Sequence, residues 1–184
     1  MIPVGAIPVL DKGYVKRVSS SLDTHSFRKF RQDVYKGVFK ESILHVPQIV
    51  LEIKCPLFLT VSLASTNLKL HTVINGTTDF YEPTVDDIKS GNHEKDVEIH
   101  EHLVANIQAT AINAQLYKED GSNSFVSSIA APIASYWVGY LIGSVADYRD
   151  FFNSKSAPLQ ILAYQKVIRD LVIAEYPDLE IHLK

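Results

Sequence analysis

The spacing of apolar residues changes along this 184-residue chain, and it constrains the fold more than any other feature of the sequence. Some apolar residues cluster in short runs, rich in β-branched side chains and bounded by turn signals, which predict strands. Others recur every three or four residues, which predicts amphipathic helices. The predicted strands lie at 7–18, 49–53, 57–63 and 72–78, and the predicted helices at 27–38, 96–117, 124–130, 135–152 and between Pro158 and Pro177. Together the two patterns predict one α+β domain over residues 1–184.

Three of these predictions depend on two or three residues each. The break Lys54-Cys55-Pro56 separates two apolar runs, so we expect two strands there instead of one. Gly139 and Gly143 would share one face of the helix 135–152, and small residues at that spacing permit close approach of another helix in the core or at a subunit interface. The Asn75-Gly76 pair among β-branched residues is typical of a hairpin.

The composition is that of a globular protein, with 46% hydrophobic and 21% charged residues. The formal net charge of -3 argues against a nucleic-acid coat protein or a polybasic membrane binder, so we expect no nucleic-acid partner. The charge is unevenly spread, at +5 over residues 1–40 and -6 over residues 79–101. A basic N-terminal quarter can face phosphate or a neighbouring subunit, although a solvated face is the simpler interpretation.

The single cysteine, Cys55, excludes an intrachain disulfide and a cysteine-based zinc site. It lies in an apolar run and is expected to be a small core residue. The longest apolar stretch, 132–146, is shorter than the roughly 20 residues of a membrane span. No secretory signal is visible at the N-terminus, so we expect a soluble, cytoplasmic protein without a membrane partner.

The usual catalytic motifs are missing from the sequence. It has no glycine-rich phosphate loop and no G-x-S-x-G nucleophile elbow, and it offers no catalytic residue that we can nominate. Glu94, Glu98 and His102 lie at i, i+4 and i+8, a spacing that can ligate a metal. A carboxylate metal site needs matching ligands from a facing helix, and the later helices offer few, so we expect the acidic start of a helix and no metal.

The most informative signal is the order of several short motifs. They are Val9-Leu10-Asp11-Lys12-Gly13-Tyr14-Val15, His45 with the strand-like run 49–58, Asn75 with Tyr81-Glu82-Pro83, Ala131-Pro132, and Pro158-Leu159-Gln160. In this order they resemble the flavin-dependent thymidylate synthases, the ThyX family. The resemblance implies a mixed sheet packed against long helices, and a homotetramer with pockets between subunits. It also implies FAD, which in that family passes a methylene carbon from a folate, reduced by NADPH, to dUMP.

The chain departs from the family at its arginines. The R-H-R triplet falls on Ser65-Thr66-Asn67 or on Leu68-Lys69-Leu70, and other family arginines fall on Phe80, Ser128, 144–146 and Tyr164. Arginine binds phosphate through paired, charge-assisted hydrogen bonds, each contributing about 1.5–3 kcal/mol. Losing several of them argues against ordinary thymidylate synthesis and against a retained FAD site.

We therefore predict a ThyX-like protein that has lost this chemistry and binds a nucleotide or related small molecule between the subunits of a homo-oligomer, as a tetramer. The predicted ligand-binding residues are His45, Ser65, Thr66, Asn67, Lys69, Asn75, Tyr81 and Gln160. Some have simpler explanations: His45 as a core residue, Asn75 as part of the turn, and Gln160 as a solvent-facing side chain.

Two alternatives remain open from the sequence. The first is a divergent FAD-dependent thymidylate synthase, which would be yellow when purified. The second is a structural or interaction protein without a small ligand. In that case the aromatic residues Trp137, Tyr140, Tyr148, Phe151 and Phe152 would mark an oligomer interface.

Overall fold

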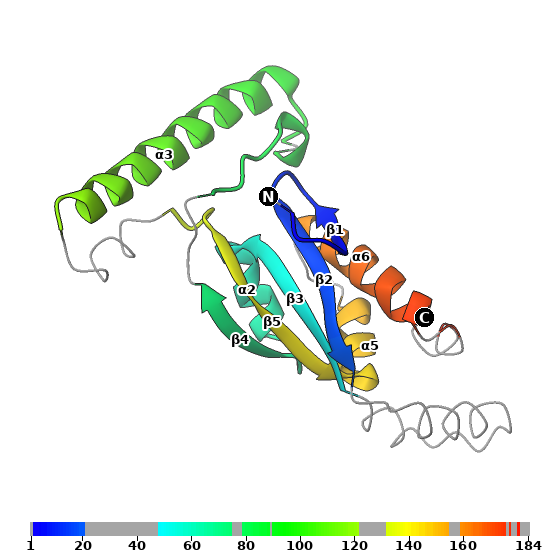
Figure 1. The fold of residues 1–184 in the computed structure, drawn as a ribbon. Helices are drawn as coiled ribbons and strands as arrows, with labels where there is room; N and C mark the ends of the chain where they lie inside the picture. The colour runs from blue at the N-terminus through cyan, green and yellow to red at the C-terminus, as the bar shows by residue number, and fades with distance from the viewer. Residues whose placement is uncertain are drawn as a thin grey trace, which may run out of the picture.

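The computed structural model describes residues 2–20, 48–74, 79–88, 90–121, 132–154 and 159–175, together with 177 and 180. Its strands form one sheet in the order β1-β2-β3-β5-β4 (Figure 1). The strands are β1 (Ala6–Val9), β2 (Gly13–Ser20), β3 (Gln48–Pro56), β4 (Lys69–Ile74) and β5 (Tyr136–Ser144). The helices are α2 (Leu57–Ala64), α3 (His93–Glu119), α5 (Val145–Asn153) and α6 (Leu159–Glu175), with a short 3-10 helix η2 (Val85–Asp87).

Helices α2, α5 and α6 cover one face of the sheet (Figure 1). The core between these two layers includes Leu51, Ile53 and Cys55 of β3, Leu59 and Leu63 of α2, Tyr148 and Phe151 of α5, and Ile161, Tyr164 and Ile168 of α6. The α+β class and the packing of helices on a sheet are confirmed. The pairing differs in one respect from the mixed sheet that the resemblance implies, because every described strand pair is antiparallel.

The run 57–63 is a helix, and the strand predicted there is wrong. Strand β3 continues through the expected break as far as Pro56, which then occupies the N-cap position of α2 without a side-chain capping hydrogen bond. In a strand, Leu59, Val61 and Leu63 would all face the core. Here Leu59 and Leu63 are fully buried while Val61 is 72% exposed, because a four-residue spacing places only the two leucines toward the sheet.

The helix predicted over 135–152 is only half correct, since it begins at Val145 after strand β5. Ser144 ends the strand and caps the helix by accepting a hydrogen bond from the backbone N–H of Asp147. Gly139 serves strand packing and not a helix contact, because a Cβ there would overlap the Trp137 ring and the His71 carbonyl. Aromatic and β-branched side chains on β5 favour the strand.

The aromatic residues that would mark an interface are mostly core residues. Trp137, Tyr148 and Phe151 are at most 3% exposed within a single chain, so they cannot mark a subunit interface. Tyr140 and Phe152 are half-buried. Cys55 is fully buried as predicted, and burial raises the pKa of its thiol.

The two long helices are confirmed. Helix α6 starts directly after Pro158, and α3 covers the predicted stretch and ends just before Gly121, whose φ of 72° suits glycine. Helix α3 is about 40 Å long at 1.5 Å per residue and lies beside the sheet-and-helix body, not on it (Figure 1). None of the helices within the described ranges has the length and apolar character needed to cross a membrane. The helices predicted at 27–38 and 124–130 and the Asn75-Gly76 turn lie outside the described residues.

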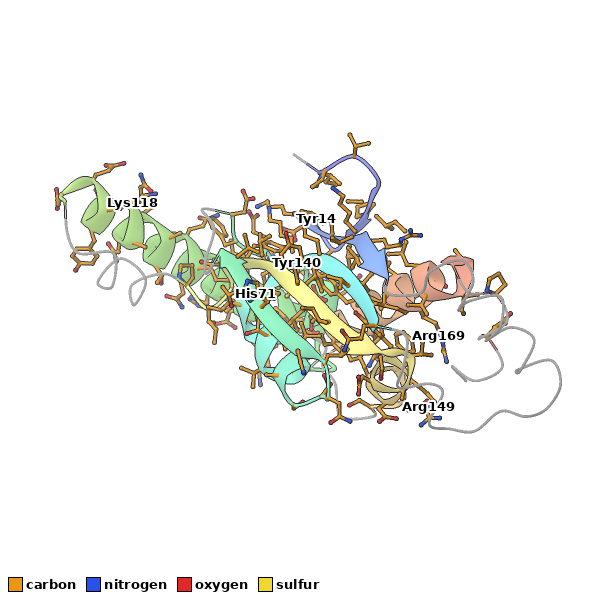
Figure 2. All side chains as sticks on the ribbon, turned by 60° about the horizontal axis from the view of Figure 1, so that its bottom comes forward. Tyr14, His71, Lys118, Tyr140, Arg149 and Arg169 are labelled. Carbon is orange, nitrogen blue, oxygen red and sulfur yellow. The ribbon has the colours of Figure 1, made fainter. Side chains whose placement is uncertain are left out.

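No described helix covers the second face of the sheet (Figure 2). Strand register aligns Lys16, Glu52, Tyr140 and His71 in one row across four strands. The rings of His71 and Tyr140 are nearly parallel with centroids 6.3 Å apart. The hydroxyl of Tyr14 donates to Glu52 Oε1 at 2.7 Å on the same face.

Candidate functional site

A groove of about 500 Å³ lies between α3 and the body of the protein. Its apolar walls come from the start of α2 at Phe58, from the turn at 132–134, and from Leu103 and Ile107 of α3. Five polar side chains also line it: Tyr81, Asp87, Asn106, Thr110 and Gln160. An apolar concavity with a few polar groups is the usual form of a small-molecule site.

Asp87 is the centre of a hydrogen-bond network at one wall of the groove. Its carboxylate accepts from the Tyr81 hydroxyl at 2.8 Å, from the Thr84 backbone N–H and hydroxyl at 2.7 and 2.8 Å, and from Gln160 Nε2 at 3.2 Å. Thr84 and Asp87 form the capping box of η2. The network therefore joins the segment 81–87 to the first turn of α6.

These contacts fix the charge state of the wall. Burial raises the pKa of Asp87, but the hydrogen bonds from Thr84, Tyr81 and Gln160 outweigh burial, so the pKa lies below its usual value. Burial and the hydrogen bond to Asp87 raise the pKa of Tyr81 to about 12. At neutral pH the wall carries a carboxylate, and Tyr81 is a neutral phenol.

Two lysines hold the segment that precedes this network. Lys12 Nζ lies 3.0 Å from Glu82 Oε1 and donates to the Phe80 carbonyl at 3.2 Å. Lys54 pairs with Asp79, and its ammonium lies 5.1 Å from the centre of the Tyr136 ring. Because these lysines belong to the β1–β2 turn and to β3, they tie the groove wall to the sheet.

Helix α3 forms the opposite wall and is anchored near its start. Asn92 caps the helix by accepting from the Lys95 backbone N–H at 3.2 Å. The ring Nε2 of His100 donates to the Pro83 carbonyl at 2.9 Å, and Asp96 accepts from the Ser90 backbone N–H at 2.8 Å. These bonds set the distance between α3 and the segment 81–87, and hence the width of the groove.

The structure brings together two of the predicted ligand-binding residues, Tyr81 and Gln160, which both bind Asp87. Ser65 and Thr66 lie at the end of α2, where their hydroxyls donate to backbone carbonyls, and they line a separate cavity of about 20 Å³. Asn67 and Lys69 are exposed.

Lys69 lies far from the groove within one chain. It pairs with Ile142 of β5, six residues from Tyr136 at the groove end of that strand. At about 3.4 Å per residue this is a separation of about 20 Å. His45 and Asn75 lie outside the described residues. A ligand role for Ser65, Thr66, Asn67 and Lys69 stays a prediction. Within a single chain these four residues do not line the groove that Tyr81 and Gln160 line.

Sequence reasoning missed Asp87, Asn106 and Thr110. In the charge pattern Asp87 is only one of the acids in 79–101, although Thr84-Val85-Asp86-Asp87 is a recognisable capping-box pattern. Asn106 and Thr110 are four apart on α3, which places them on one helix face. No local pattern indicates that this face of α3 lines the same groove as Asp87 and Gln160, which are themselves 73 residues apart in the sequence.

The positions aligned with the family's arginines have structural contacts here. Tyr164 is fully buried and its hydroxyl donates to the Lys54 carbonyl at 2.7 Å. Phe80 lies beneath the Lys12 ammonium, 5.1 Å from its ring centre, and Ser144 caps α5. Ser128 lies outside the described residues. Tyr164, Phe80 and Ser144 thus offer no cationic side chain for the phosphates of FAD at these positions.

The described ranges contain no group of three histidine, cysteine or acidic side chains arranged to hold a metal. Within the sequence-predicted cluster, His102 Nε2 lies 4.0 Å from Glu98 Oε1, and both side chains are largely exposed. The pair is an ordinary i, i+4 contact on a helix surface.

No protein-family model matches the chain, and no curated protein matches its sequence. A solved structure is similar: the UMP/dUMP methylase PolB from Streptomyces cacaoi, bound with 5-Br dUMP. The likeness has a TM-score of 0.68 and covers 94% of each chain at 12% sequence identity. The chain has a ThyX-like fold. At this sequence identity the likeness establishes the fold, but it does not identify a ligand or an activity.

Proposed function

We propose that this protein binds a nucleotide or a related small molecule on a ThyX-like scaffold and has lost thymidylate synthase chemistry. The observation that carries the proposal is the likeness to a methylase bound with 5-Br dUMP over 94% of both chains. The groove between α3 and the body is the best candidate for the binding site in a single chain.

The size and lining of the groove support a flat organic ligand. Its volume of about 500 Å³ falls within the roughly 300–1,000 Å³ of typical small-molecule sites. Phe58 and Ile107 offer apolar surfaces to a planar ring, while Asn106 and Thr110 offer hydrogen bonds to its edge. Such a combination suits a heterocyclic base better than an extended apolar chain.

The side chains that replace the family's arginines support the loss of methyl transfer. Tyr164, Phe80 and Ser144 are each committed to contacts within the fold. Each charge-assisted bond to phosphate that is missing weakens nucleotide and flavin binding by about 1.5–3 kcal/mol. The proposed function therefore does not include an FAD-dependent reaction.

The composition of α3 supports a homo-oligomer. Its residues 103–117 include no charged side chain, yet Ile112, Leu116 and Tyr117 are 61%, 50% and 45% exposed. A solvated helix normally carries charges on its outer face. We propose that a second copy of the chain covers this stretch, so that the groove is closed between subunits in a tetramer.

A ligand panel tests the binding proposal. Thermal unfolding of the purified protein is followed with uridine, UMP, dUMP, dTMP, FAD and a folate, because a ligand that binds only the folded state raises the melting temperature. We expect a pyrimidine compound to raise it and FAD to leave it unchanged. In the variant Ile107→Trp, which fills the groove, the shift disappears, whereas Val61→Trp on the exposed face of α2 retains it. A panel without any shift would contradict the proposal.

Light scattering after size-exclusion chromatography tests the oligomer. We expect a tetramer for the wild type and smaller species for Ile112→Glu and Leu116→Glu. The matched control Lys95→Glu also adds negative charge to α3, but in its charged first turns, and it leaves the mass unchanged. A monomeric wild type would refute the inter-subunit part of the proposal.

A further inference from the structure

We propose that the groove selects an uncharged nucleoside over the corresponding nucleoside phosphate. This inference rests on the proposed function, since it names the class of ligand for the same site. It follows from the sign of the charge around the groove, which differs from what a phosphate-binding site requires.

The charge that lines the groove is negative. Asp87 is the one ionised side chain among the described lining residues, and none of those residues is a lysine or arginine. The surrounding segment adds to the field, because residues 79–101 carry a net charge of -6 in the sequence, and Lys12 and Lys54 offset only two of these negative charges. A phosphate entering the groove would therefore meet charge of its own sign.

The lysines beside this segment are already occupied. Lys12 pairs with Glu82 at 3.0 Å, and Lys54 pairs with Asp79. Binding phosphate through either lysine would therefore break an ion pair close to the groove. The described part of the chain thus supplies no ready cation for a phosphate at this site.

The polar groups that remain suit a base and a sugar. Asn106 has an amide donor and acceptor and makes no side-chain hydrogen bond to another described residue. The Thr110 hydroxyl donates to the Asn106 carbonyl at 2.7 Å, so its oxygen is still able to accept. Neutral donors and acceptors of this kind match the edge of a pyrimidine and the ribose hydroxyls.

The repulsion is large enough to measure. A phosphate dianion about 6 Å from one ionised carboxylate, at the permittivity of bulk water, loses about tenfold in affinity. The lower permittivity of a partly closed groove increases this factor. The effect decreases with ionic strength, because surface charges are screened over about 8 Å at physiological salt.

Calorimetric titration of the full chain with uridine and with UMP, at low and high salt, tests the inference. We expect uridine to bind at least about tenfold more tightly than UMP, and the difference to shrink at high salt. Asn106→Lys places a cation in the groove and should reverse the preference. Asn113→Lys makes the same change two helical turns away, outside the groove lining, and should leave the preference as in the wild type.

The two proposals fail in different ways. Tighter binding of UMP than of uridine by the wild type would overturn the charge inference and leave the proposed function standing. An Asn106→Lys variant that still prefers uridine as strongly as the wild type would also overturn the inference. Binding of neither compound would refute the proposed function, and the inference with it.

Discussion

Removing the carboxylate of Asp87 should destabilise the protein far more than removing its neighbour Asp86. In Asp87→Ala the part-buried hydroxyl of Tyr81 loses its acceptor, and a polar group that burial leaves without a partner costs about 1–3 kcal/mol. Loss of the η2 cap adds about 1 kcal/mol. We expect a decrease in unfolding free energy of about 2–4 kcal/mol in total.

Urea unfolding monitored by circular dichroism measures this difference. Asp86 is exposed on the same short helix and makes no described hydrogen bond, so Asp86→Ala should change stability by less than about 0.5 kcal/mol. In Asp87→Ala combined with Tyr81→Phe, the two losses should not add, because both remove the same bond. Equal and small effects of Asp87→Ala and Asp86→Ala would refute the role of the network.

Replacing the same residue by asparagine gives a difference in stability with a predictable pH dependence. Since the pKa of Asp87 is lower in the folded protein than its usual value, the carboxylate contributes stability above the unfolded-state pKa of about 3.9. That contribution is lost as the pH falls through the folded-state pKa. The stability difference between wild type and Asp87→Asn should therefore be constant from pH 5 to 7 and decrease below about pH 4. A difference that grows on acidification would contradict the assignment.

Three further predictions concern the fold. Gly139→Ala should lower the unfolding free energy by at least about 2 kcal/mol, because its Cβ would overlap the Trp137 ring and the His71 carbonyl; an unchanged urea midpoint would contradict the packing of β5. Ser144→Ala should cost about 1 kcal/mol through loss of the α5 cap, whereas a cost below the error of urea unfolding would mean that the cap contributes nothing. Cys55 should resist alkylation by iodoacetamide in the native protein and react in 6 M guanidinium, since burial raises the pKa of its thiol; rapid native labelling would place it at the surface.

The sequence predicts the fold best where the hydrophobic pattern is long. Helix α3 and helix α6 repeat their periodicity over several turns, and both are found as expected. The run 57–63 satisfies both a strand and a helix pattern, because its apolar residues are continuous. The four-residue spacing of Gly139 and Gly143 predicts a helix contact, whereas in strand β5 Gly139 lies against the Trp137 ring and Gly143 against Leu68.

The candidate site is less predictable than the fold for a physical reason. The resemblance to ThyX predicts Tyr81 and Gln160 as ligand-binding residues, and in the structure both hydrogen-bond to Asp87. The wall formed by Asn106 and Thr110 depends on the angle at which α3 leaves η2, which no local sequence pattern encodes. Lys69 and Tyr81 lie at different ends of the sheet, so only an assembled oligomer can bring both to one ligand.

The most direct test of the account is a crystal structure of the protein grown with uridine. The account predicts electron density for the ligand between α3 and the turn at 132–134, in contact with Ile107 and within hydrogen-bond distance of Asn106 or Thr110. Ligand density on the open face of the sheet, over His71 and Tyr140, with an empty groove would contradict it.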